Sequence, residues 1–297
     1  MHRSDFHVLY DESKQRIIGI PYFLVHKEKS LDYTELKKKL EGQVIEDTVD
    51  IDLEYEEFDE VIVPEVFIEN NKMILLNSID DIHVYPDTLF GRITVDHVSR
   101  INFRKNNVVI VQTSSHRFQI LKDEISGNYF LIIYSPRGKY RKILKILSNM
   151  FYNVGIVVVP SILNPRKINE IVQEQIGDLL DTTLENFPSL TISKKRIFGR
   201  GFQEDNDYLR DSKVGSVYQH RFAYNDRLDD NPIVVSISGD GLIRFFNNIS
   251  YKYFNNFMKK NVLHRLRKLD QGPFRIPLKS FILSSIEEDE EDEEHIP

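Results

Sequence analysis

The chain contains 297 residues, 41% of them hydrophobic and 29% charged, with a formal net charge of −7. This composition is ordinary for a folded globular protein, and the length predicts two compact domains. The absence of cysteine excludes disulfides, cysteine-ligated zinc and thiol nucleophiles, and the apolar runs are far shorter than the roughly 18 residues of a membrane span, so we expect a cytoplasmic or nuclear protein.

The first 50 residues are expected to contain a strand and a short helix. Ile17 to Val25 reads as a strand. Ser30 or Asp32, followed by Glu35, provides the N-terminal cap of a short helix, which Gly42 ends. A strand and a helix therefore precede a longer β-rich region.

Residues 49–121 read as a meandering antiparallel sheet. From Val49 to Glu56, apolar and acidic residues alternate, which predicts a strand with one apolar face and four carboxylates on the other. Asn70-Asn71 and Asn106-Asn107 are typical turn sequences. Further strands are expected around residues 61–68, 73–76, 92–95, 100–103, 108–112 and 117–121.

A buried strand and an amphipathic helix follow. Tyr129 to Tyr134 is apolar throughout, and Tyr140 to Phe151 has an apolar stripe at helical spacing with basic residues on its other side. This helix closes a first domain near residue 152. Alternatively, a strand at Ile156 to Val159 completes a β-α-β unit with Tyr129 to Tyr134.

The second half is predicted to contain two helices and four strands. Asn164 as N-cap and Pro165 as first helical residue begin a helix whose apolar residues recur at helical spacing to about Glu185. A final helix is expected from about Ser250 to Leu269. Strands are expected at 190–198, 214–224, 233–238 and 242–246, the last two joined by the hairpin turn Gly239-Asp240-Gly241.

These elements predict an α+β protein made of two β-rich domains, each closed by an amphipathic helix. The first domain, residues 1–152, carries the acidic strand and the closing helix. The second, residues 153–283, ends in a basic helix. Residues 284–297 contain eight consecutive acids, Glu287 to Glu294, and are expected to form a disordered tail.

Charge is strongly segregated along the chain. Two short stretches, Glu46 to Glu60 and Glu287 to Glu294, contain 17 of the 46 acidic residues. The remaining 274 residues carry 39 Lys and Arg against 29 Asp and Glu, a formal charge of about +10. Like charges held together attract an oppositely charged polymer, so this basic body favours nucleic acid as the partner.

Three basic clusters supply the candidate nucleic-acid-binding residues. They lie around the helix of the first domain, in the strand 190–198 with Phe198 and Phe202 nearby, and in the final helix. Such cations follow a phosphate backbone, and neighbouring aromatic rings stack on exposed bases. The candidates are Arg137, Lys139, Lys142, Lys145, Lys194, Lys195, Arg196, Arg200, Lys259, Lys260, Arg267 and Lys268.

The acidic segments support further hypotheses. Eight carboxylates on a flexible tether would compete with nucleic acid for the lysines and suppress non-specific binding. Alternatively, the acidic segments receive a basic protein, which would make the chain an adaptor or chaperone. Either role is compatible with a homo-oligomer or a larger complex. A third hypothesis is an anionic membrane surface, contacted by the helix at Lys252 to Lys268.

The sequence contains no motif that specifies a reaction. Phosphate-binding loops, dinucleotide fingerprints, nucleophile elbows and zinc-binding helix motifs are absent, so no cofactor or metal is predicted. A metal-dependent nuclease is the enzymatic alternative, in which the acidic loop 204–213, with Asp205, Asp207, Asp211 and Lys213, holds Mg²⁺ and positions an attacking water. Solvation of an exposed loop explains the same charges, so we favour a protein that binds without catalysing.

Overall fold

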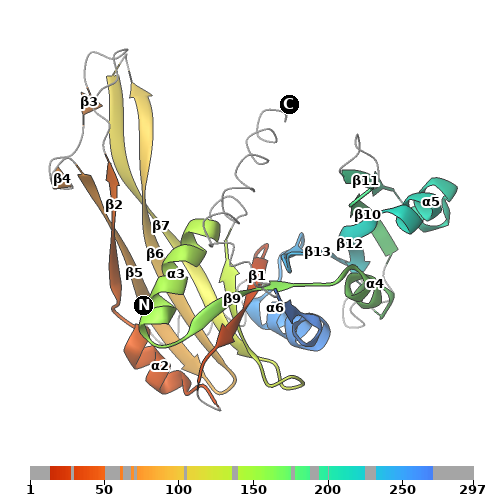
Figure 1. The fold of residues 1–297 in the computed structure, drawn as a ribbon, viewed down its shortest axis with the longest axis horizontal. Helices are drawn as coiled ribbons and strands as arrows, with labels where there is room; N and C mark the ends of the chain where they lie inside the picture. The colour runs from red at the N-terminus through yellow and green to blue at the C-terminus, as the bar shows by residue number, and fades with distance from the viewer. Residues whose placement is uncertain are drawn as a thin grey trace.

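A computed structural model of the protein describes residues 14–27, 30–50, 61–62, 68–69, 72–103, 106–135, 140–174, 178–187, 194–199, 201–224 and 232–269. In these residues the protein has a sheet-rich α+β fold, which confirms the predicted class (Figure 1). Within them, no helix is both long and apolar enough to cross a membrane. Residues 51–60, the acidic run 287–294 and the candidates Arg137, Lys139 and Arg200 lie outside the described residues.

The strands join into one hydrogen-bonded path in the order β11-β10-β12-β13-β14-β1-β8-β7-β6-β5-β2. Neighbours along this path are antiparallel. Four short strands, β3, β4, β9 and β15, pair beside it. The bounds are β1 Ile18–Val25, β2 Val44–Asp50, β3 Val61–Ile62, β4 Ile68–Glu69, β5 Lys72–Tyr85, β6 Thr88–Phe103, β7 Asn106–Lys122, β8 Tyr129–Tyr134, β9 Val157–Ile162, β10 Asp178–Glu185, β11 Lys194–Phe198, β12 Ser216–Tyr224, β13 Ile233–Ser238, β14 Ile243–Phe245 and β15 Arg267–Lys268.

β1 holds the two halves of the path together. Its residues Ile18 and Gly19 pair with β14, whereas residues 20–24 pair with β8 and residues 22–25 pair with β9. The predicted boundary at residue 152 is therefore not marked by a break in the sheet. The structure does not confirm the division into two domains.

β8, α3 (Tyr140–Asn153) and β9 form a split β-α-β unit. Both strands are antiparallel to β1 and lie on its two sides, so they run parallel to each other with β1 between them. The β-α-β alternative is thus the arrangement seen. The apolar stripe predicted for α3 is buried, including Ile143, Leu147 and Met150, which explains why this helix was recognisable from its sequence.

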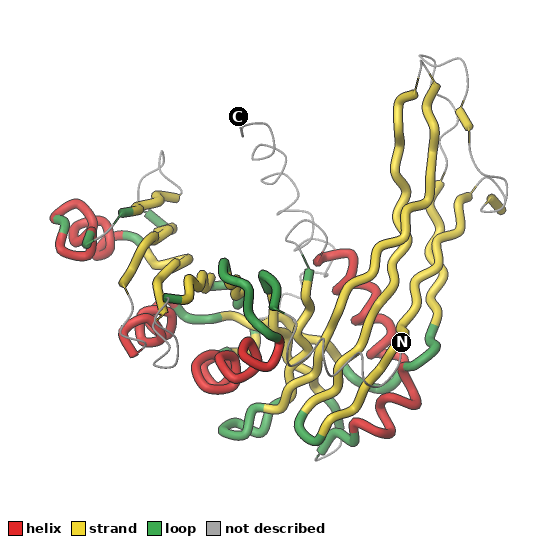
Figure 2. Tube along the Cα trace, turned by 180° about the vertical axis from the view of Figure 1, so that it is seen from behind, coloured by secondary structure: helices red, strands yellow, loops and turns green. Residues whose placement is uncertain are grey.

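Helices cover the two sides of the sheet at different places (Figures 1 and 2). α3 and α2 (Tyr33–Leu40) pack on one side of the long strands, in a cluster that we call the α3-side core. On the other side, α6 (Tyr251–Phe257), its continuation η4 (Met258–Val262) and α4 (Pro165–Glu174) pack in the α6-side core. β8 contributes to both cores, which is why its sequence is apolar without alternation.

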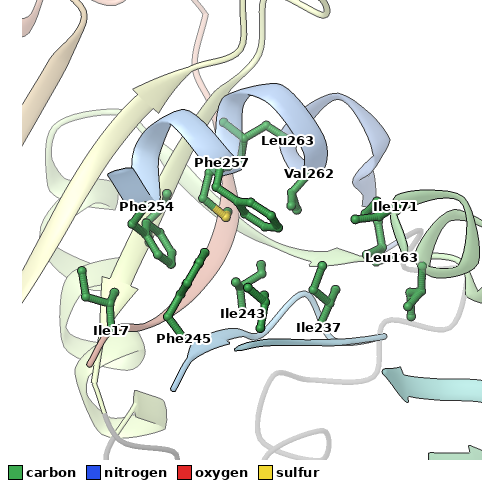
Figure 3. Packing of buried hydrophobic residues seen from close by; sticks show 14 of the residues in the cluster. Ile17, Leu163, Ile171, Ile237, Ile243, Phe245, Phe254, Phe257, Val262 and Leu263 are labelled. Atoms are coloured by element: carbon green, nitrogen blue, oxygen red, sulfur yellow. The ribbon is translucent and has the colours of Figure 1, made fainter. Parts of the chain in front are cut away.

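The α6-side core is built from aromatic side chains of α6 packed over β14 (Figure 3). The ring centroids of Phe245 and Phe254 are 5.6 Å apart, and those of Phe245 and Phe257 are 5.2 Å apart. Gly19 allows this close approach, because a Cβ there would lie 2.6 Å from the Phe254 ring. Each fully buried phenylalanine stabilises the fold by about 1.5–3 kcal/mol.

Two helix predictions differ from the structure. α4 ends at Glu174, and residues 178–185, predicted as the end of the same helix, form β10. Its leucines recur at helical spacing, but the segment pairs with β12, and a register shift after Leu179 places Leu179 and Leu184 in the same core. The final helix is α6 followed by the π-helical turn η4 and the 3₁₀ turn η5 (Leu263–Arg265), after which residues 267–268 pair with β9.

The first-half strands are longer than predicted. The segments 92–95 and 100–103 are both parts of β6, and 108–112 and 117–121 are both parts of β7. Polar residues separate the apolar segments, so the sequence suggested separate strands. In the structure these polar residues are also paired between β6 and β7, and each strand is continuous. The turn predicted at Asn106-Asn107 is wrong, since these residues pair with Phe103 and Asn102.

Candidate functional site

The side of strands β10–β14 that faces away from the helices is the candidate functional surface, and we call it the outer face. The α6-side core covers the opposite side of these strands. Exposure alternates along β11, and its exposed residues are Lys194, Arg196 and Phe198. In β12, Phe222 is fully buried in the α6-side core, so its neighbour Arg221 belongs to the outer face.

The strand register places residues from five strands in one row across the outer face. Phe198 pairs with Asp181, Asp181 with Arg221, Arg221 with Ser236, and Ser236 with Arg244. Residues directly opposite each other point to the same side of a sheet. Because neighbouring strands are about 4.8 Å apart, this row spans roughly 19 Å.

Asp181 fixes the positions of two cations on the outer face, Arg196 and Arg221. Its side chain is 2% exposed and accepts hydrogen bonds from Nε of Arg196 at 2.9 and 3.1 Å, and from Nη2 of the same residue. Nη2 of Arg221 lies 3.4 Å from its Oδ2. The hydrogen bond to Asp181 raises the pKa of Arg196. One buried carboxylate thus holds two guanidiniums, and a positive charge remains.

Aromatic rings lie among the cations of the outer face. The guanidinium carbon of Arg244 is 4.7 Å from the centroid of the Phe246 ring, and that of Arg221 is 5.5 Å from it. Nζ of Lys194 lies 4.9 Å from the ring centroid of Tyr218. Each such cation-π pair contributes about 0.5–1 kcal/mol at an exposed site and orients both groups.

Three side chains of the outer face are especially available to a ligand. Lys194 and Arg244 are exposed, and neither forms an ion pair within the part of the chain that the structure describes. Phe198 is 75% exposed, the largest fraction among the large apolar side chains described. Glu185 lies opposite Lys194 in the register, so the face is mixed in charge rather than uniformly basic.

His220 anchors the other side of β12 to α4. Its ring is buried, its Nδ1 lies 2.9 Å from Oγ1 of Thr182, and its Nε2 lies 2.5 Å from Oδ1 of Asn169. A neutral ring satisfies both contacts by accepting from the hydroxyl and donating to the amide oxygen. Burial lowers the pKa of His220 to about 4, so the ring is neutral at physiological pH.

The structure separates the predicted basic clusters. Lys195 points to the helix side of β11 and forms an ion pair with Asp211. Lys259 forms an ion pair with Asp87 in the turn between β5 and β6. Among the predicted binding residues that are described, Lys194 and Arg196 share the outer face.

The remaining candidates lie on other elements. Nζ of Lys142 donates a hydrogen bond to the carbonyl of Asp96 at 2.5 Å, and burial lowers the pKa of Lys142. Lys145 is exposed on α3, which lies toward the opposite end of the molecule from β11 (Figures 1 and 2). Lys260, Arg267 and Lys268 are exposed near the end of the described chain, and Nζ of Lys268 lies 5.5 Å from the ring centroid of Phe23.

The acidic segment 204–213, predicted as a loop, is mostly helical. The 3₁₀ turn η3 (Phe202–Glu204) leads into α5 (Asn206–Val214), and Oδ1 of Asp205 caps it by accepting from the backbone N–H of Asp207 at 2.7 Å. Hydrogen bonding from Lys195 lowers the pKa of Asp211, and Lys213 is exposed. The described residues contain no group of three His, Asp or Glu that would hold a metal ion.

Four outer-face residues, Tyr218, Arg221, Arg244 and Phe246, were not recognised in the sequence as candidates. Arg221 and Arg244 are each the one Lys or Arg of their strand rather than members of a cluster. A cation between two buried strand residues is itself a signal, because alternation sends it to the solvent side. What the sequence does not contain is the strand pairing that brings these residues together.

No family model matches the chain, and no curated protein matches it significantly. Function must therefore be argued from the site, since a fold by itself does not specify one. The outer face offers ordered cations, exposed aromatic surface and no metal-binding group within the described residues. The cations and the exposed aromatic surface suit binding of an anion.

Proposed function

We propose that the protein binds nucleic acid without catalysing a reaction, alone or as a subunit of a nucleic-acid-processing complex in the cytoplasm or nucleus. The outer face is the proposed contact surface. The observation that carries the proposal is the row containing Arg221 and Arg244, with Arg196 beside it, on a side of the sheet that the α6-side core leaves open.

The cations of the outer face are suited to phosphate groups. Arginine presents five donors in a planar fork that matches phosphate oxygens, and it stays charged at every physiological pH. Asp181 neutralises one charge of Arg196 and Arg221, while Lys194 and Arg244 have no ion-pair partner among the described residues. Each neutralised phosphate would release counterions, so affinity should fall steeply with salt.

Two sequence-based predictions complete this proposal. The acidic run 287–294 would compete with nucleic acid for the cations and so limit non-specific binding. A division into two β-rich units near residue 152, each closed by a helix, stays a prediction and is not required by the outer face.

The test is a titration of a labelled single strand of about 20 nucleotides, followed by fluorescence anisotropy over a range of salt concentrations. The double variant Lys194→Glu, Arg244→Glu should weaken binding at least about tenfold at low salt and reduce the slope of log K against log salt by roughly 1.4, the value for two lost contacts to a single strand. Removal of residues 287–294 should tighten binding in the same assay.

The matched control is Lys145→Glu with Lys260→Glu, which changes the net charge equally on exposed residues of other elements. It should leave affinity within about twofold, because long-range charge effects are screened by salt. Equal losses in both double variants would reject the outer face as the surface. Absence of binding by the unmodified protein would reject the function.

Binding of a basic protein is the second candidate. β2 ends the strand path, and its acidic residue Glu46 is exposed, so an extended basic segment has both a strand edge and carboxylates available within the described residues. A lysine-rich peptide in place of the oligonucleotide, in the same titration, separates the two candidates.

A further inference from the structure

We infer that the outer face takes single-stranded nucleic acid, with bases stacked on Phe198 and on the Arg244–Phe246 pair. This inference rests on the proposed function and names the class of ligand. It distinguishes a surface that contacts bases from one that contacts only the phosphate backbone.

Phe198 is the first stacking position. It lies at the edge strand of the path, is three-quarters exposed, and has the cation Arg196 two residues before it on the same face of β11. A phenylalanine ring exposed to this extent does not contribute the free energy that burial would provide, and no stabilising contact of this ring is evident in the described residues. A base stacking on the ring would cover this surface while Arg196 reaches the adjacent phosphate.

The second stacking position is at the other end of the row. Arg244 is exposed and its guanidinium lies over the Phe246 ring. A guanidinium plane is itself a stacking platform for a base, and its contact with the ring restrains Arg244 before the ligand arrives. Because roughly 19 Å separates the two ends of the row, a ligand must extend across several strands to contact both.

The shape of the surface favours a single strand over a duplex. Bases of a duplex are read by an element that enters a groove, such as a helix or a two-stranded ribbon. The helices α4, α5 and α6 all contribute to the side opposite the outer face, through contacts such as His220 with Asn169 of α4 and Lys195 with Asp211 of α5. An open sheet with aromatic residues matches the way in which single strands with unstacked bases are bound.

The experiment uses the full chain and three labelled probes of equal length: a single strand, the duplex of the same sequence, and an abasic phosphodiester strand. The single strand should bind at least about tenfold more tightly than the abasic strand, because the two share the phosphodiester backbone and only the single strand has bases that can stack. The duplex should bind no more tightly than the abasic strand.

Two variants locate the stacking. Phe198→Ala should weaken binding of the single strand by about tenfold and leave the abasic strand unchanged, and Phe246→Leu should act in the same direction while keeping apolar volume. The matched control is Tyr152→Ala, which removes a 71% exposed aromatic ring from α3. Circular dichroism and a melting curve confirm that each variant is folded.

The outcomes separate this inference from the proposed function. Equal affinity for single, duplex and abasic probes, with no effect of Phe198→Ala, would overturn stacking and leave nucleic-acid binding intact. A loss with Tyr152→Ala equal to that with Phe198→Ala would place the bases elsewhere and also overturn it. No binding of any probe would reject both.

Discussion

The tripeptide His-Arg-Phe occurs twice, at residues 116–118 in β7 and at residues 220–222 in β12. Both phenylalanines are fully buried. Both arginines lie over an aromatic ring, at 5.4 Å from the centroid of Tyr251 in β7 and at 5.5 Å from that of Phe246 in β12. Identical sequence therefore gives the same local arrangement of strand, core and cation-π contact.

The two arginines differ in what covers them. Nη1 of Arg117 donates a hydrogen bond of 3.1 Å to the hydroxyl of Tyr251, the first residue of α6, so this cation joins a helix to the sheet. Arg221 faces the side that α6 does not cover. The comparison teaches that the position of the nearest helix decides whether a strand cation has a structural role or remains available to a ligand, and the local sequence does not contain that position.

The outer face is also the continuation of a covered surface. Beyond Arg244, the last residue of the row, the register continues to Ile18 of β1, which packs against the α3-side core. The same side of one sheet is thus covered by α3 among the long strands, whereas no described helix covers it at β10–β14. This contrast makes the open end the better candidate for binding.

The largest effects on stability are expected from the phenylalanine of each tripeptide, and the two should be equal. Phe118→Ala and Phe222→Ala should each lower the free energy of unfolding by about 3–5 kcal/mol, because each leaves a cavity in a packed core. Urea denaturation measures both, with the leucine variants as milder controls. A cost below about 1 kcal/mol at Phe222 alone would show that the β12 end is not packed as described.

The histidine of the second tripeptide should make stability depend on pH. The unfolded chain takes up a proton on His220 near pH 6.5, whereas burial holds the folded pKa at about 4. The free energy of unfolding should therefore fall as pH drops from about 6.5 to 4, by about 3 kcal/mol across that range.

Denaturation curves of the wild type and of His220→Gln at several pH values check this dependence. The variant should lose most of it. Part should remain, because burial also lowers the pKa of His264. An unchanged pH profile in the variant would show that His220 is accessible to protons in the folded protein.

The arginines should give the smallest stability effects and the clearest functional contrast. Arg117→Ala should destabilise the protein by about 1 kcal/mol, through loss of the hydrogen bond to Tyr251, and leave nucleic-acid affinity unchanged. Arg221→Ala should cost less, since Arg196 still satisfies Asp181, and should weaken binding. Thermal melting and the anisotropy titration measure the two effects, and a reversed pattern would contradict the distinction.

Elements whose apolar residues form one continuous pattern could be predicted from the sequence. α3 was recognised because its stripe is a single continuous feature, and the cap at Asp32 of α2 is local chemistry. β10 was mistaken for helix because its leucines recur at helical spacing. Leu179 and Leu184 enter the same core only through the register shift in the pairing with β12, which the sequence does not reveal. Elements set by non-local pairing are those that single-sequence reasoning misses.

The candidate site followed the same division. Lys194 and Arg196 were named as candidates because they belong to a run of basic residues, which is visible in the sequence. Lys195, between them, was grouped with them although strand alternation sends it to Asp211 on the other side. Arg221 and Arg244 join the surface through the register of β12, β13 and β14, which is a property of the folded sheet.

The position of β1 has a consequence for biosynthesis. Its residues Ile18 and Gly19 leave the ribosome early, yet their neighbour β14, residues 243–245, is the last strand of the path to be made. Through most of translation this apolar strand has an unsatisfied edge, and closing so long a loop is entropically slow. Until β14 emerges, this edge is exposed to association with other chains.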